Sequence, residues 1–377
     1  MNIAILSMQK VENFGSVLQA YALKKILEKK GHDVYFIDIK KNDKDYYLLN
    51  NHNQIFELEK EQTGIKGKLK KINKYVINRC INLFRLKRQN LEFEKFRVEN
   101  LEIYKKLNNY DICIIGSDEV FNCLDSGFWG FTSQLFGNIP EARKKITYAA
   151  SCGSTKYENL PSEVKKTIIE AFGNISNFSV RDENTKEFVT KLTNKFVEKN
   201  LDPVLIYKFK SEIRNANMIN VPKRYCIIYS YGNRIHSKNE IDKIKSFCKN
   251  QKLIPITIGG PQFWVSRHIV CSPFECLKLF TKADFVITDT FHGTIFSMKY
   301  AKKFAVIIRD SNRNKLEDLI KTMSCEAHVI NDFSKLNDIY IIKKDEKGIE
   351  SIINRELNHT ITYLNSAIEE CNDFTDL

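Results

Sequence analysis

The first 40 residues of this 377-residue chain show the pattern of a strand, a helix and a second strand. A short apolar run at 3–6 is followed, after a loop, by residues 16–30, whose apolar side chains include helical spacings. Gly31 ends the helix, and the apolar stretch 34–39 is typical of a second strand. Two strands joined by a helical crossover pair in parallel, so we expect a parallel α/β sheet.

The pattern continues along the chain and restarts after a polar stretch around 208–222. Further strands are expected at 111–116, 146–151, 177–180, 225–229, 253–258, 284–288 and 304–308. The length suits two domains of ordinary size. We therefore predict an N-terminal α/β domain at 1–210, a C-terminal α/β domain at 220–345, and a C-terminal helix in 346–377 that packs back on the first domain.

The chain is basic, with 59 Lys and Arg against 46 Asp and Glu, a net charge of +13. Residues 60–106 alone hold fourteen basic and five acidic residues, a net +9. Within them, apolar residues at helical spacing predict a basic amphipathic helix at about 65–88. This helix is either a solvated element that packs on the first domain or a face that attracts anionic lipid head groups or phosphorylated acceptors. No nucleic-acid motif accompanies the charge, so we expect no nucleic-acid partner.

The cysteines and the hydropathy point to a cytoplasmic protein. No run approaches the roughly 20 apolar residues that span a bilayer. Ten cysteines in 377 residues are not dense, and Cys80, Cys113, Cys226 and Cys248 lie inside apolar patterns typical of reduced core thiols. There is no CxxC pair and no other defensible ligand spacing, so we predict no metal.

The sharpest candidate site follows the predicted strand 284–288. Thr290 is a suitable N-cap for the next helix, and a helix N-terminus binds anions with its free N–H groups. His292 and Thr294 would then lie in the first turn, where Gly293 allows a close backbone approach. The alternative is a capped turn with a surface histidine.

Two other strand ends present charged side chains. Asp118 follows the strand 111–116 and could accept a proton from a sugar hydroxyl, or it could cap the next turn. Arg181 follows the strand 177–180, and its planar fork suits a carboxylate or a phosphate. The alternative for Arg181 is an ion pair with Asp182 or Glu183. Neither GxxxxGK[ST] nor GxGxxG nor GxSxG occurs, which argues against the usual nucleotide enzymes and hydrolases.

Six segments in order resemble the polysaccharide pyruvyl transferase family. They are NFGSVLQAYAL from Asn13, GSDEVFN from Gly116, YAASCG from Tyr148, SVRD from Ser179, LDP from Leu201 and TDTFHGT from Thr288. The family's counterparts are of the type NYGAVLQAYAL, GSDQVWN, YAASFG, SVRE, LDP and TDSFHGT. Among the positions where the chain differs are Glu119 for Gln, Phe121 for Trp, Cys152 for Phe and Thr290 for Ser.

The resemblance implies a fold of two Rossmann-like domains facing a central cleft, like that of the GT-B glycosyltransferases. It implies phosphoenolpyruvate as donor substrate with no further cofactor, and a sugar or lipid-linked oligosaccharide as acceptor of a pyruvate ketal. The implied catalytic residues are Asp118, Arg181 and His292. The implied donor-binding residues are Arg181, Thr290, His292, Gly293 and Thr294. The implied acceptor-binding residues are Asn13, Gly15, Ser16, Gln19, Asp118 and Asn122.

Two other functions stay open from the sequence. One is a GT-B glycosyltransferase that uses a nucleotide sugar, because a similar architecture serves both reactions. The other is a non-catalytic component of a polysaccharide assembly complex. In each case the basic segment suggests a peripheral position at the inner membrane face, next to an anionic surface.

Overall fold

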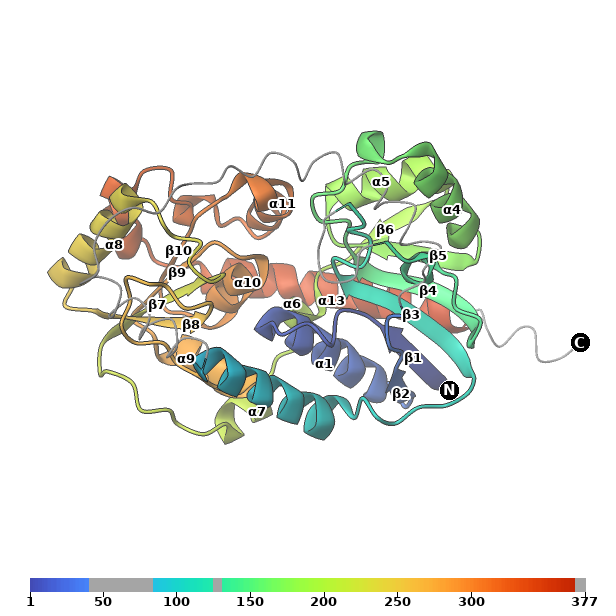
Figure 1. Cartoon of the computed structure of the whole chain (residues 1–377), viewed down its shortest axis with the longest axis horizontal. Coiled ribbons are helices and arrows are strands. Elements are labelled where there is room, and N and C mark those ends of the chain that lie inside the picture. Colours follow the sequence, from blue (N-terminus) through green and yellow to red (C-terminus); the bar gives the residue numbers. More distant parts are fainter. Residues whose placement is uncertain (41–83, 125–130, 370–377) are drawn as a thin grey trace, which may run out of the picture.

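Two parallel sheets form the frame of the protein (Figure 1). The computed structural model describes residues 1–40, 84–124 and 131–369. Within them the first sheet has the order β2-β1-β3-β4-β5-β6 and the second the order β10-β9-β7-β8. Neighbouring strands in both sheets run parallel. The expected fold class, two Rossmann-like α/β units in a GT-B-like arrangement, is confirmed.

The elements alternate along the chain as crossover connections require. The strands are β1 (Asn2–Leu6), β2 (Asp33–Phe36), β3 (Tyr110–Asp118), β4 (Ala142–Ala150), β5 (Ile175–Val180), β6 (Val197–Lys199), β7 (Tyr225–Ser230), β8 (Ile254–Gly259), β9 (Phe285–Thr288) and β10 (Phe304–Val306). The α-helices include α1 (Phe14–Glu28), α4 (Ser162–Phe172), α5 (Glu183–Thr193), α6 (Pro203–Ile206), α7 (Lys210–Asn215), α8 (Lys238–Asn250), α9 (Pro273–Lys282), α10 (Phe291–Tyr300), α11 (Arg313–Thr322), α12 (Leu336–Ile341) and α13 (Glu346–Glu369). Residues 84–96 form a further helix, which continues as a π-helical turn at Arg97–Leu101.

Helices cover both faces of each sheet, and the central strands are apolar for that reason. All residues of β7 and β9 are buried. The polar stretch around 208–222 contains α7, and residues 216–224 then run to β7 without a helix or strand.

One of the hydrophobic clusters is shared by the two halves, and α1 is central to it, whereas two further clusters each lie within one half. Thirteen of its residues are buried, including Phe14 and Tyr21. The ring of Phe14 lies 6.4 Å from that of Tyr229 in the second half, and α1 contacts both α9 and α10. The apolar character of α1 on all sides therefore follows from its place between the two sheets.

The C-terminal helix α13 runs from the second half toward the first (Figure 1). Near its end, the hydroxyl of Tyr363 donates to the carbonyl of Thr147 in β4 at 2.7 Å. The hydroxyl of Thr360 bonds to Asn200 at 3.2 Å, just beyond β6. These contacts attach the end of α13 to the first sheet.

Three further predictions concern the basic helix, the cysteines and membrane-spanning segments. The basic helix predicted at about 65–88 lies outside the described residues, except for its last five positions, which are helical. The eight cysteines in the described ranges are free and buried, as predicted for Cys113, Cys226 and Cys248. Cys80 lies outside those ranges. Among the described helices, none is both long enough and apolar enough to cross a membrane.

Candidate active site

The site begins where β3 ends, at Asp118. Gly116, two residues earlier in β3, has a φ of 120°, and a Cβ there would lie 2.3 Å from the carbonyl oxygen of Tyr148, so only glycine fits this position. The Asp118 carboxylate accepts a hydrogen bond from the hydroxyl of Ser16 at 2.7 Å. It also accepts one from the N–H of Glu119 at 3.0 Å. Asp118 is thus held at the N-terminal end of α1.

Arg181 reaches the same place from the end of β5. Its Nη1 lies 3.1 Å from Oδ2 of Asp202, and its Nη2 lies 3.7 Å from Oδ1 of Asp118. The guanidinium also lies 4.1 Å from the centre of the Phe291 ring. The alternative ion pair within Arg181's own segment is wrong, because Asp182 instead caps α5 by accepting from the N–H of Thr185 at 2.8 Å.

His292 lies in the first turn of α10, which Thr290 caps as predicted. The Thr290 hydroxyl accepts from the N–H of Gly293 at 3.0 Å, and the Thr294 hydroxyl donates to the Thr290 carbonyl at 2.9 Å. The Nε2 of His292 lies 3.4 Å from Oδ2 of Asp202. His292 is 8% exposed, so the surface-histidine alternative is wrong.

Asp202 joins these groups, and the sequence reasoning did not assign it to the site. Its Oδ2 lies near both Arg181 and His292, accepts from the Ser117 hydroxyl at 3.1 Å, and is fully buried. Burial raises the pKa of Asp202, but the neighbouring His292 and Arg181 charges outweigh burial and lower this pKa to about 2. Asp202 therefore stays ionised at neutral pH. Its signal in the sequence was the LDP segment.

A second charged pair crosses between the halves. Glu119, directly after Asp118, forms an ion pair with Lys315 of α11. The side-chain amide of Asn122 donates to Glu119 at 2.8 Å. Burial raises the pKa of Glu119, yet the charges of Lys315 and Arg181 lower it to about 2. The site thus contains two cations: Arg181, which is buried beside Asp118 and Phe291, and Lys315, which is partly buried and pairs with Glu119.

The remaining predicted acceptor residues lie on α1. Asn13 is its N-cap, with Oδ1 accepting from the N–H of Gly15 at 2.7 Å. Gly15 lies directly against His292, and a Cβ on it would lie 2.1 Å from Nδ1 of that ring. The amide of Gln19 is fully buried and donates to the hydroxyl of Ser7 at 2.7 Å. Gly15 and Ser16 therefore meet the catalytic candidates, whereas Asn13 and Gln19 support the backbone around them.

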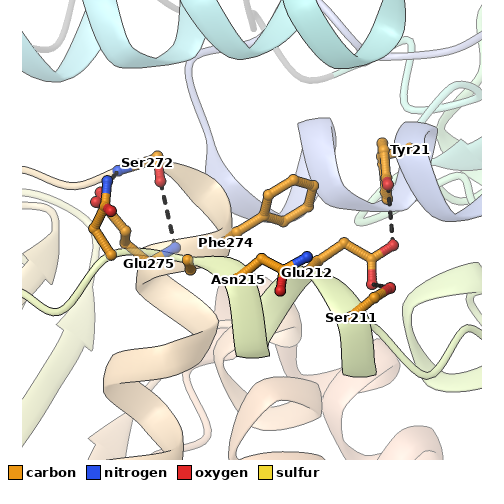
Figure 2. A pocket seen from close by; sticks show the side chains of 9 residues that line it. Tyr21, Ser211, Glu212, Asn215, Ser272, Phe274 and Glu275 are labelled. Atoms are coloured by element: carbon orange, nitrogen blue, oxygen red, sulfur yellow. Dashed lines mark hydrogen bonds between the residues drawn. The ribbon is translucent and has the colours of Figure 1, made fainter.

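A separate pocket of about 320 Å³ lies at the junction of α1, α7 and α9 (Figure 2). One of its two carboxylates, Glu212, accepts hydrogen bonds from Tyr21 at 3.0 Å, from Tyr207 at 2.6 Å and from Ser211 at 2.8 Å. None of the predicted site residues lines this pocket. Its polar groups hold α7 against α1 and lie outside the charged cluster described above.

Two Rossmann-like units with a charged cluster at their strand ends form a GT-B-like architecture, whose ligands bind outside the carboxyl ends of the strands. The family model of polysaccharide pyruvyl transferase matches residues 13–311. The chain therefore belongs to the polysaccharide pyruvyl transferase family, and the resemblance found in the sequence is confirmed. No sequence among curated proteins matches it significantly.

Several solved structures are similar over nearly the whole chain. The UDP-N-acetylglucosamine 2-epimerase of Rickettsia bellii has a TM-score of 0.48 at 11% identity, over 99% of this chain and 98% of its own. The UDP-GlcNAc 2-epimerase of Methanocaldococcus jannaschii has 0.46 at 12%, over 96% and 100%. The calicheamicin glycosyltransferase CalG4 has 0.41 at 10%, over 100% and 99%. At these TM-scores and identities the similarity supports no conclusion about activity or substrate.

Proposed function

We propose that this protein transfers pyruvate from phosphoenolpyruvate to two hydroxyls of one sugar residue, forming a ketal and releasing phosphate. The acceptor in this proposal is a surface glycan assembled on a lipid carrier, so that the protein acts in the cytoplasm at the inner membrane face. One observation carries the proposal. Asp118, Arg181 and His292 come from three distant segments of a pyruvyl transferase family member and converge: Arg181 lies beside Asp118 and Asp202, and Asp202 also lies beside His292.

The charges of the site suit a small anionic donor. Phosphoenolpyruvate has a carboxylate and a phosphate, and Arg181 has donors left for one of them, since its Nε has no partner among the described residues. The first turn of α10 leaves the N–H groups of Phe291 and His292 without intrahelical partners, at the positive end of the helix. Lys315 adds a second cation. These groups support a donor position between Arg181 and α10.

In the proposed chemistry, His292 protonates the methylene carbon of the donor, which becomes a methyl group and leaves positive charge at C2. The Asp202 carboxylate, 3.4 Å from Nε2 of His292, orients the imidazole for this step. A sugar hydroxyl bonds to C2 and gives its proton to Asp118. A second hydroxyl then replaces the phosphate at C2. The proton of this second hydroxyl leaves with phosphate. The proton on Asp118 then returns through solvent to His292, so both groups are regenerated and no water is consumed.

Ligand-induced thermal stabilisation tests the donor. A ligand at 100 times its Kd stabilises the folded state by about 2.7 kcal/mol. We expect phosphoenolpyruvate to raise the Tm, and neither 3-phosphoglycerate, a control anion with the same two kinds of charged group, nor UDP-sugars to do so. Stabilisation by UDP-sugars alone would instead indicate glycosyl transfer. No stabilisation by any of these ligands would favour the non-catalytic alternative.

The contact between Gly15 and His292 gives a prediction about pyruvyl transfer. In Gly15→Ala the new Cβ would overlap the ring, so His292 must move by about 1 Å or more. A displacement of that size costs about 10²-fold in rate. We expect kcat to fall by about that factor. Gly232→Ala, whose Cβ would lie 3.9 Å from its nearest neighbour, is the matched control and should keep its kcat. Equal rates for both variants would show that His292 is not held against α1.

A further inference from the structure

The helix formed by residues 84–96 is attached to both halves by its inner face. The Gln89 side chain donates to the carbonyl of Cys271 at 2.8 Å and accepts from the Cys271 N–H at 3.1 Å. The Phe93 ring lies 4.8 Å from that of Phe14, and the Phe96 ring 5.0 Å from that of Phe274. Figure 1 shows this helix running alongside α1 and α9. These contacts fix which side of the helix faces outward.

The outer face carries an apolar stripe. Phe84 is 64% exposed, Leu91 63% and Val98 42%. These residues are seven apart, which places them on one side of a helix and opposite the buried Phe93. Large exposed apolar side chains in a row, on a helix whose other face is already packed, mark an interaction surface.

Cations flank this stripe. Lys87, Arg88 and Lys95 are exposed, and by helical spacing they lie beside Phe84, Leu91 and Val98. Among the residues that the structure describes, none forms an ion pair with these three cations. The acidic residues are placed differently, since Glu94 bonds to Arg97 at 2.8 Å and Glu92 is partly buried. Glu99 is also exposed and lies beside Lys95 by helical spacing, at the end of the segment, so the cations outnumber the acidic residues on this side.

We propose that this outer face, consisting of Phe84, Lys87, Arg88, Leu91, Lys95 and Val98, binds an anionic lipid surface. Apolar side chains on such a helix insert at the boundary of head groups and acyl chains, while the flanking cations pair with lipid phosphates. Nucleic acid would use the cations but would gain little from Leu91 and Val98. The combination of an aliphatic stripe and unpaired cations therefore favours lipid.

The position of this face relative to the site is consistent with that partner. Phe93 packs on Phe14, and the next residue, Gly15, contacts His292. Binding to a membrane through this helix would hold the N-terminal end of α1 close to the lipid. This last step rests on the proposed function, because it takes the acceptor to be lipid-linked. The binding of the outer face to lipid does not depend on which acceptor the protein uses.

Vesicle flotation of the full chain, without donor or acceptor, tests the proposal independently of catalysis. We expect binding to phosphatidylcholine vesicles that contain phosphatidylglycerol, and little binding to phosphatidylcholine alone. The triple variant Lys87→Gln, Arg88→Gln, Lys95→Gln should weaken binding by at least about tenfold. Leu91→Ser with Val98→Ser should weaken it as well, with an unchanged Tm because both side chains are exposed.

Matched controls use exposed residues elsewhere. The first control is a triple variant of α8, Lys238→Gln with Lys243→Gln and Lys249→Gln, which makes the same change in net charge. The second is Ile169→Ser on α4, which removes an apolar side chain that is 49% exposed. Both should bind as the wild type does. An equal loss of vesicle binding in the α8 triple variant would show that binding depends only on the net charge of the protein, which would overturn the proposal. The absence of binding to anionic vesicles would also overturn the proposal. The outer face would then contact another segment of the chain or a protein partner instead.

Discussion

Replacing His292 by glutamine should lower kcat for pyruvyl transfer by about 10³-fold while the protein stays folded. Loss of a general acid costs typically 10²–10⁴-fold, and glutamine cannot give a proton to carbon. Glutamine retains an N–H donor that can face Asp202, which keeps that buried carboxylate partnered. The measurement is phosphate release from phosphoenolpyruvate in the presence of an acceptor, with thermal unfolding recorded in parallel.

A second buried histidine in the same half provides the control. Nδ1 of His268 bonds to the hydroxyl of Thr257 at 2.9 Å, away from the charged cluster. Burial lowers the pKa of His268 to about 4, so this ring is neutral. His268→Gln should lose stability at most and keep its kcat. If His292→Gln retained more than a tenth of the wild-type kcat, the assignment of the acid to His292 would be wrong.

Replacing Arg181 by glutamine should affect both the donor KM and the stability. Arg181 lies between the carboxylates of Asp118 and Asp202, and removing one partner of a buried ion pair costs about 3–5 kcal/mol. The loss of the guanidinium fork should raise the KM for phosphoenolpyruvate by about 10²-fold, since hydrogen bonds to charged groups are worth about 1.5–3 kcal/mol each. Steady-state kinetics at varied donor concentration and denaturant unfolding measure the two effects.

The conservative variant separates the two effects. Arg181→Lys restores the charge near Asp202 but not the planar fork, so we expect most of the stability to return while the KM stays high. A KM that returned to the wild-type value would show that only a positive charge is needed. An unchanged KM in Arg181→Gln would place the donor elsewhere in the protein.

The pH dependence of stability tests the ion pair between Arg181 and Asp202 in the same variant, Arg181→Gln. The pKa of Asp202 in the folded protein is about 2, below the ordinary value of about 3.9 for an unfolded chain. The ionised carboxylate therefore contributes stability above pH 4 that is lost as the pH falls toward 2. Without Arg181 this folded pKa should rise, so acid unfolding of the variant should begin at a higher pH than in the wild type.

The sequence predicted those elements whose signal is local. The apolar runs of β1, β3, β7 and β9 stood out because buried parallel strands are apolar throughout. The start of α10 was predictable from Thr290, a capping residue placed directly before an apolar helix. Asp118 and Arg181 were found because each lies at the end of such a strand, and His292 because it lies in the first turn of such a helix.

The residues missed depend on contacts between distant segments. Asp202 follows β6, whose three residues Val197–Lys199 are too few and too polar to be recognised as a strand. Only its pairing with β5 brings Asp202 to Arg181. Lys315 lies on an amphipathic helix of the second half, and its partner Glu119 is 196 positions away. The contact of Gly15 with His292 likewise exists only where the two halves meet, and no spacing along the chain indicates it.

The most direct test of the central claim is mass spectrometry of the acceptor. The purified protein is incubated with phosphoenolpyruvate and a panel of lipid-linked and simple glycosides, and phosphate is measured in the same samples. The proposed reaction predicts one acceptor whose mass increases by one pyruvic acid less one water, with one phosphate released per acceptor converted. Phosphate release without a change in any acceptor, or the addition of a hexose from a nucleotide sugar in a parallel incubation, would contradict it.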